Sequence, residues 1–267
     1  NITGRSVAPK SAITALEGIY CDASAELTFT GYNMETAVIY RVDAEITEPG
    51  KCVFPARLFG DIIRRLPEGP VTVAVDDNYK VSVRAGYSAF SISAEPGEDY
   101  PSLPDVGSGR SVTLPQCNLK ELIGSTIFAV SENQGRPIHT GVKFEVEEEK
   151  VSAIAVDGFR LGLSNEKLKK PIEGNYEFVV PGRSVAELGR VIKETDEDIE
   201  IAVSQKHLRI SKGNITFVAR LLEGKFITYS SVIPNDKAMT AVVRVDDMIE
   251  SVDRVGVVIN ERLRSPL

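Results

Sequence analysis

The 267-residue sequence has no tryptophan, two histidines and three cysteines, and only 7% of its residues are aromatic. Three cysteines are an odd number, and no two form a Cys-x-x-Cys pair, which argues against a disulfide framework or a zinc site. We therefore expect Cys21, Cys52 and Cys117 to be reduced structural thiols. His139 and His207 stand at no recognisable motif spacing from Ser, Cys or a carboxylate, so a nucleophilic triad is not indicated.

Long apolar stretches are also missing, because charged residues interrupt every run well short of the roughly 18 residues that a membrane helix needs. The start of the chain shows no basic segment followed by an apolar one, so neither a membrane nor export is indicated. We expect a cytoplasmic protein. With 42% hydrophobic and 26% charged residues, it can bury one or two cores. The first residue is Asn1, which leads us to expect a processed or truncated chain.

Phosphate-binding loops of the Gly-x-Gly-x-x-Gly or Gly-Lys-Ser/Thr type are absent, and Gly224-Lys225 is followed by phenylalanine. The carboxylate clusters at 147–149 and 196–198 fall at expected turns, where a solvated hairpin tip is the usual explanation. The sequence therefore predicts no catalytic residue, no metal site and no cofactor.

A pattern of strand, Pro-Gly break and amphipathic helix at 178–193 is the first sign of an internal repeat. It is echoed at 54–66, with an offset of 183 − 57 = 126 residues between Arg183 and Arg57. Residues 81–90 likewise align with 208–217, since 208 − 81 = 127. Gly18 and Gly141 also correspond, at an offset of 123. One repeat is therefore about 125 residues long, an ordinary domain size.

Each repeat has the pattern of a helix, a run of strands, a second helix and another run of strands. Residues 119–130 have helical spacing, and residues 71–93 alternate as strands do. We expect an α+β fold of repeated domains, each with two helices packed on antiparallel sheets. Turn and linker residues place the domains at 1–107, 111–234 and 239–267. The third contains an expected helix with Asp246 or Asp247 as its N-cap.

The two aligned helices carry arginine on the face opposite their apolar stripes. In the later helix the stripe is Val185, Leu188 and Ile192, and in the earlier one it is Phe59, Ile62 and Leu66. A single basic helix face is most often solvated surface, and the net charge of −7 says nothing about where the cations gather. Two copies in the same phase instead favour contact with a polyphosphate backbone, weak, salt-sensitive and indifferent to sequence.

Residues 155–161, Ala-Val-Asp-Gly-Phe-Arg-Leu, have two interpretations. The simpler is a strand, a turn and a second strand within a core. The other is an apolar groove that docks a peptide. Composition alone leaves both open.

Taken in order, the motifs resemble the beta subunit of bacterial DNA polymerase III, the replicative sliding clamp. The resemblance runs over nearly the whole chain and rests on residues 55–59, Phe128-Ala129-Val130-Ser131, Arg136-Pro137, Thr140-Gly141, residues 156–161, Val180-Pro181-Gly182-Arg183 and Leu221 to Phe226. It implies three similar clamp domains per chain. When full length, such a chain forms a head-to-tail homodimer, a ring that surrounds double-stranded DNA with its helices inside.

The family catalyses no reaction of its own, and serves as the processivity factor that keeps a polymerase on DNA. The resemblance implies DNA-facing positions at the following basic residues: Lys10, Arg57, Arg64, Arg136, Arg183, Arg190, Lys193 and Arg254. It also implies that the family's first strand and most of its first helix precede Asn1, and that most of the third domain follows Leu267.

A pocket for linear peptide motifs is the second implied site. Its partners would be the DNA polymerase III catalytic subunit, the clamp loader, and other polymerases and repair proteins. The implied pocket residues are Val156, Gly158, Phe159, Arg160, Leu161, Ile227, Val232 and Leu263. The chain departs from the family pattern at Ile227-Thr228, Phe159 and Ser231, which bears on the peptide preference.

The sequence therefore favours a sliding clamp. The alternative is a repeat-built scaffold that binds peptides and no DNA, with its basic faces merely solvated. An enzyme that uses His139 or His207 is a more distant third.

Overall fold

Strands β4, β9 and β13 each end in a proline, and an α-helix begins at the next residue each time. The prolines are Pro55, Pro115 and Pro181, with φ of −60°, −59° and −51° and ψ in the extended range. The pyrrolidine ring fixes φ and removes the N–H, so a proline donates nothing to the strand ladder and is tolerated where the ladder stops. The Pro-Gly break expected from the sequence is thus a strand-to-helix junction.

The computed structural model describes residues 2–107, 109–234 and 239–257, in two units, Asn1–Phe226 and Ile227–Leu267, which are described separately. The first repeat contains β1 (Gly18–Ala23), β2 (Leu27–Tyr32), β3 (Thr36–Val42), β4 (Lys51–Pro55), α1 (Ala56–Arg65), β5 (Thr72–Val75), β6 (Lys80–Ala85), β7 (Ser88–Ser93) and β8 (Glu95–Pro96). The second repeat contains β9 (Arg110–Pro115), α2 (Gln116–Gly124), β10 (Gly141–Val146), β11 (Lys150–Val156), β12 (Leu161–Lys167), β13 (Tyr176–Pro181), α3 (Gly182–Val191), β14 (Asp198–Val203), β15 (His207–Lys212) and β16 (Ile215–Arg220). The second unit contains α4 (Val245–Gly256).

Short 3-10 helices punctuate the chain. They are η1 (Thr3–Arg5), η2 (Thr14–Glu17), η3 (Gly97–Asp99), η4 (Ile127–Ala129), η5 (Pro137–Thr140) and η6 (Tyr229–Ser231). In the part of the chain that the structure describes, no helix is both long enough and apolar enough to span a bilayer.

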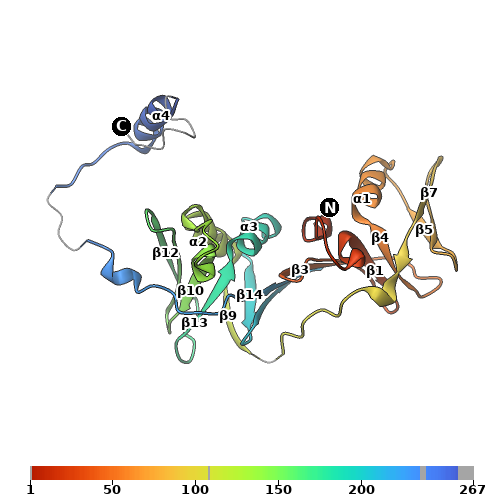
Figure 1. Ribbon diagram of the computed structural model, residues 1–267, viewed down its shortest axis with the longest axis horizontal. Helices are drawn as coiled ribbons and strands as arrows, with labels where there is room; N and C mark the ends of the chain where they lie inside the picture. The colour runs from red at the N-terminus through yellow and green to blue at the C-terminus, as the bar shows by residue number, and fades with distance from the viewer. Residues whose placement is uncertain (1, 108, 235–238, 258–267) are drawn as a thin grey trace. The chain divides into compact units, whose positions relative to one another are not determined.

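One antiparallel sheet joins the two repeats. Its strand order is β8-β4-β1-β2-β3-β16-β15-β14-β9, and the junction is the pairing of β3 with β16, where Val38 lies opposite Phe217. A buried hydrogen bond of 2.6 Å between the hydroxyls of Thr36 and Ser184 also crosses from one repeat to the other. Two smaller sheets, β12-β11-β10-β13 and β5-β6-β7, complete the unit. Helices α1, α2 and α3 lie on one side of the nine-stranded sheet (Figure 1).

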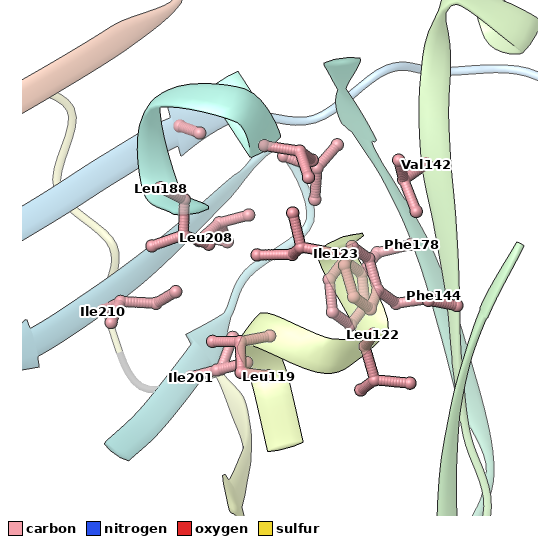
Figure 2. Packing of buried hydrophobic residues seen from close by; sticks show 14 of the residues in the cluster. Leu119, Leu122, Ile123, Val142, Phe144, Phe178, Leu188, Ile201, Leu208 and Ile210 are labelled. Carbon is pink, nitrogen blue, oxygen red and sulfur yellow. The ribbon is translucent and has the colours of Figure 1, made fainter. Parts of the chain in front are cut away.

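The larger core lies between the paired helices α2 and α3 and two sheets. Leu119, Leu122 and Ile123 of α2 meet Leu188 of α3. Figure 2 shows these side chains between two groups of strand residues, Ile201, Leu208 and Ile210 on one side and Val142, Phe144 and Phe178 on the other. A second core in the first repeat is centred on the stacked rings of Phe54 and Phe59, 4.3 Å between centroids. The predicted α+β fold with helices on antiparallel sheets is confirmed.

Two details of the expected helices are wrong. The helix expected over 119–130 ends at Gly124, because the Thr126 hydroxyl donates to the carbonyl of Leu122 at 2.6 Å and the chain turns into η4. Neither Asp246 nor Asp247 is an N-cap, because both lie inside the first turn of α4 and Arg244 stands at the cap position. Their negative charges still interact favourably with the positive end of the helix dipole.

Gly141 and Gly18 begin the equivalent strands β10 and β1, opposite Pro181 and Pro55 respectively. A Cβ on Gly141 would lie 2.5 Å from the carbonyl oxygen of Val180, which is backbone and cannot move aside cheaply. We expect Gly141→Ala to destabilise the protein by about 1–3 kcal/mol in urea unfolding, the usual range for overpacking. Gly124→Ala is the matched control, since nothing lies within 4 Å of that position. Equal effects of the two substitutions would contradict the close approach at Gly141.

Candidate nucleic-acid interface and docking hairpin

Helices α1 and α3 are equivalent elements of the two repeats, each of 10 residues. Phe59 and Ile62 of α1, and Val185 and Leu188 of α3, are buried. Arg57 and Arg183 are exposed and stand at the second position of each helix. The predicted phase is confirmed, because the apolar residues of both helices face the core and the arginines face solvent.

Two equivalent loops, each closed by one backbone hydrogen bond, precede these helices in the sequence. In the first, the N–H of Ala8 donates to the carbonyl of Leu16, and in the second the N–H of Ser131 donates to the carbonyl of His139, each at 3.0 Å. Both ends show the repeat offset, since 131 − 8 and 139 − 16 are each 123. The loops expose Lys10 and Arg136, two of the predicted DNA contacts. Lys193 also lies outside the helices, since α3 ends at Val191.

The second loop contains one cation, Arg136, beside His139. Partial burial, together with the positive charge of Arg136, lowers the pKa of His139 below its ordinary value. The imidazole is therefore neutral at pH 7, and its ring packs edge-on against Phe226, 5.4 Å between centroids. His139 thus has an ordinary packing contact, and Arg136 supplies the charge of this loop.

The cations of the two helices differ in their partners. Arg64 pairs with Asp61 in α1, and Arg190 pairs with Glu187 in α3. In the second unit, Arg254 pairs with Glu250 at 3.5 Å. All eight predicted DNA-contact residues are exposed, seven in the first unit and Arg254 in the second. That they face a common DNA duplex stays a prediction.

The tip of the β11–β12 hairpin is built on one carboxylate. Asp157 accepts hydrogen bonds from the backbone N–H groups of Phe159 and Arg160 at 3.0 and 2.9 Å, and from Nε of Arg160 at 2.8 Å. The Phe159 N–H and the Arg160 guanidinium hold the pKa of Asp157 below its ordinary value. Gly158, at φ +92°, supplies the left-handed residue that the turn needs. The side chain of Phe159 is 99% exposed.

The predicted peptide-pocket residues are divided among different parts of the chain. Val156 to Leu161 lie in the first unit, where Val156 is buried and Leu161 is half-buried. Ile227 and Val232 belong to the second unit, and Leu263 lies outside the described residues. The fully exposed phenyl ring is the feature of this hairpin that a docking surface would use.

Sequence reasoning missed two features of the first repeat. Strands β5 and β7 are the outer strands of their sheet, so among the described residues the far side of β7 has no partner. A cleft of about 490 Å³ opens beside the start of α1, lined by residues that include Gly18, Phe54, Arg57, Leu58 and Glu95. The repeat offset is a signal that could have indicated the cleft. Leu58 aligns with Ser184, and Ser184 is buried against the first repeat, whereas Leu58 is exposed beside the cleft.

The described residues contain no cluster of three or more His, Cys, Asp or Glu side chains that could bind a metal ion.

Comparisons with known proteins agree with this geometry. Residues 2–104 match the family model of the DNA polymerase III beta subunit N-terminal domain, and residues 113–227 match that of its central domain. The beta sliding clamp of Bacillus subtilis is 30% identical over 266 residues, which cover 96% of this chain and 70% of that protein. The beta sliding clamp of Staphylococcus aureus is 30% identical, covering 98% and 71%.

Solved structures give the same result. The sliding clamp of Bacillus subtilis superposes with a TM-score of 0.91 at 30% identity, covering 97% of this chain and 71% of that one. The DNA polymerase III beta subunit of Pseudomonas aeruginosa gives 0.91 at 28% identity, covering 98% and 72%.

Proposed function

Since the chain belongs to the DNA polymerase III beta subunit family, the sliding clamps, we propose that it surrounds double-stranded DNA and tethers the replicative polymerase to it. It is a non-catalytic processivity subunit, and it acts in the bacterial cytoplasm where the chromosome lies. The observation that carries the proposal is the recurrence of one basic helix face and one basic loop in both repeats.

Contact with DNA is made by these basic elements. Arg57 and Arg183 project from equivalent positions of α1 and α3, and Lys10 and Arg136 project from equivalent loops. Repeated guanidinium and ammonium groups at fixed intervals match a phosphate backbone, whose charges are also periodic. We assign DNA-facing roles to these four residues and to Arg64, Arg190, Lys193 and Arg254. A weak contact suffices, because encirclement prevents escape.

The junction between the repeats indicates how a ring would close. Strand β16 pairs with β3, and the internal repeat makes β7 the equivalent of β16, since 215 − 88 = 127. It likewise makes β12 the equivalent of β3, since 161 − 36 = 125. Both β7 and β12 are outer strands of their sheets in the described chain. Each of these outer strands is therefore equivalent to one strand of the β3–β16 junction, and within the described chain it lacks the other strand.

Two complementary outer strands on one chain favour head-to-tail assembly, which produces a ring when the rotation closes. We infer that β12 receives the third repeat of its own chain, and that β7 receives the third repeat of a second copy. The domains are then 1–107, 111–234 and the domain that begins at 239. The cleft beside α1 fits this reading, because its equivalent in the second repeat is filled by the Thr36 turn of the first.

The β11–β12 hairpin is the second functional surface that we propose. A fully exposed phenylalanine on a rigid turn is an anchor for a linear peptide, and Arg160 stands beside it. The peptides belong to the polymerase catalytic subunit, the clamp loader, and other polymerases and repair proteins. By family resemblance Ile227, Val232 and Leu263 take part.

Retention on circular DNA tests the main proposal. We expect the full-length protein, loaded onto a nicked circular plasmid by a clamp loader, to co-elute with the DNA in gel filtration. Cutting the plasmid once should release it within minutes, because a ring can then slide off an end. The measurement is the fraction of labelled protein in the DNA peak before and after cutting.

A site-specific protein bound beside the cutting site is the control, since it blocks one end and should slow release. Equal retention on circular and linear DNA would contradict encirclement. No retention on either, with peptide binding intact, would favour a scaffold that does not bind DNA.

A further inference from the structure

Each repeat places a carboxylate three residues before an arginine in the last turn of α1 or α3. The pairs are Asp61 with Arg64 in α1 and Glu187 with Arg190 in α3. Both members keep the repeat offset, since 187 − 61 and 190 − 64 are each 126. Because the same ion pair occurs at equivalent positions of both repeats, it belongs to the repeated basic face that we propose contacts DNA.

The carboxylates divide the arginines into two kinds. In the part of the chain that the structure describes, Arg57 and Arg183 form no ion pair, whereas Arg64 and Arg190 each have a carboxylate within reach. A guanidinium that already binds a carboxylate must give up that partner to bind a phosphate. The carboxylate also repels the phosphate directly. Each pair therefore lowers the attraction between its helix and a DNA backbone.

The pair in α3 is the more constrained of the two. The side chain of Glu187 is only 22% exposed, and its Oε1 accepts from Arg190. Its Oε2 is enclosed and has no hydrogen-bond partner within the described residues. If Arg190 moved to a phosphate, it would leave a half-buried carboxylate without its counter-ion, which is costly. The contact of Arg190 with a DNA phosphate is therefore weakened.

From this geometry we infer that Asp61 and Glu187 limit how tightly the two helices hold the DNA backbone, so that the ring slides rather than binds. The inference rests on the proposed function. Asp61 and Glu187 are positioning residues, because they act through Arg64 and Arg190 and need not touch DNA. Arg57 and Arg183 then supply the stronger phosphate contacts.

The test uses Asp61→Asn with Glu187→Gln in the full-length clamp. Affinity for a short linear duplex is measured by fluorescence anisotropy between 50 and 200 mM salt. Each arginine released to a phosphate should steepen the slope of log K against log salt by about 0.9. Between 50 and 200 mM salt, each such increment enlarges the loss of affinity by a further factor of about 3.5. Single-molecule tracking should show correspondingly slower diffusion along DNA.

Glu26→Gln with Glu147→Gln is the matched control. It removes the same number of charges, and Glu26 and Glu147 also form ion pairs, with Arg41 and Lys150, at the equivalent hairpins β1–β2 and β10–β11. We expect its salt slope to equal that of the wild type. The conservative exchange Asp61→Glu with Glu187→Asp should bring the slope back toward the wild-type value.

If the carboxylate–arginine ion pairs only stabilised their helices, the substitutions would lower the free energy of unfolding and leave the salt slope unchanged. An unchanged slope in the folded Asp61→Asn, Glu187→Gln variant, or an equal change in the control, therefore overturns the inference. These outcomes differ from failure of the proposed function, in which the wild type itself would not remain on circular DNA.

Discussion

Phe90→Asp is expected to abolish retention of the full-length clamp on circular DNA. Phe90 is the repeat equivalent of Phe217, since 217 − 90 = 127, and Phe217 is 1% exposed at the junction of the two repeats, whereas Phe90 is 39% exposed on β7. If β7 pairs with a second chain as β16 pairs with β3, Phe90 becomes buried in the ring. An aspartate there would place an unpaired charge in an apolar interface.

Sedimentation velocity measures the outcome directly. We expect the variant to remain folded and monomeric at concentrations where the wild type is a dimer, and to leave circular DNA at once. Phe159→Asp makes the same exchange at a fully exposed site. It should keep the dimer and lose affinity for partner peptides. A dimeric Phe90→Asp ring would mean that β7 is not the assembly edge.

Phe217→Ala should have the largest effect on stability of any exchange considered. Phe217 lies opposite Val38 across the junction, and its side chain belongs to the same core as Ile210 and Leu208. Truncating a fully buried phenylalanine typically costs about 3–5 kcal/mol. In a chain of this size, that lowers the melting temperature by roughly 6–20 °C. Thermal and urea unfolding followed by circular dichroism would measure it.

Phe159→Ala removes the same atoms from an exposed position and should leave the melting temperature unchanged to within about 1–2 °C. If the two substitutions cost the same, the junction between repeats does not carry the stability that its burial indicates. A transition that splits in two for Phe217→Ala would show that the repeats unfold together only through this junction.

The repeat allowed much of the fold to be predicted from the sequence. Apolar positions such as Val185 and Leu188 have a helical period, and a proline precedes each of α1, α2 and α3, so element type and phase followed from local pattern. The end of α2 did not follow, because the Thr126 hydroxyl competes for the carbonyl of Leu122. The cap of α4 was also wrong, since Asp246 and Asp247 are equally suited to a first turn.

Strand pairing across the repeats was beyond the sequence. Alternation assigns Phe217 to a buried face, but it cannot tell which of several similar strands lies beside β16. The buried bond between Thr36 and Ser184 was hidden for the same reason, because its two residues are 148 apart. The candidate arginines of α1 and α3 were found by helical phase, whereas Lys10, Arg136 and Arg254 came from the family resemblance. The division of the helix arginines into paired and unpaired ones needed coordinates, since a carboxylate three residues away does not reveal which rotamer either side chain adopts.

The pairing of β3 with β16 has a consequence for how such a ring opens. Within one chain, the polypeptide joins the two repeats covalently, so strands β3 and β16 that separate meet again at high effective concentration. The equivalent seam at β7 would have no such tether. Two seams of similar chemistry would then differ in lifetime through connectivity alone, and a loading machine would need to separate only the untied one.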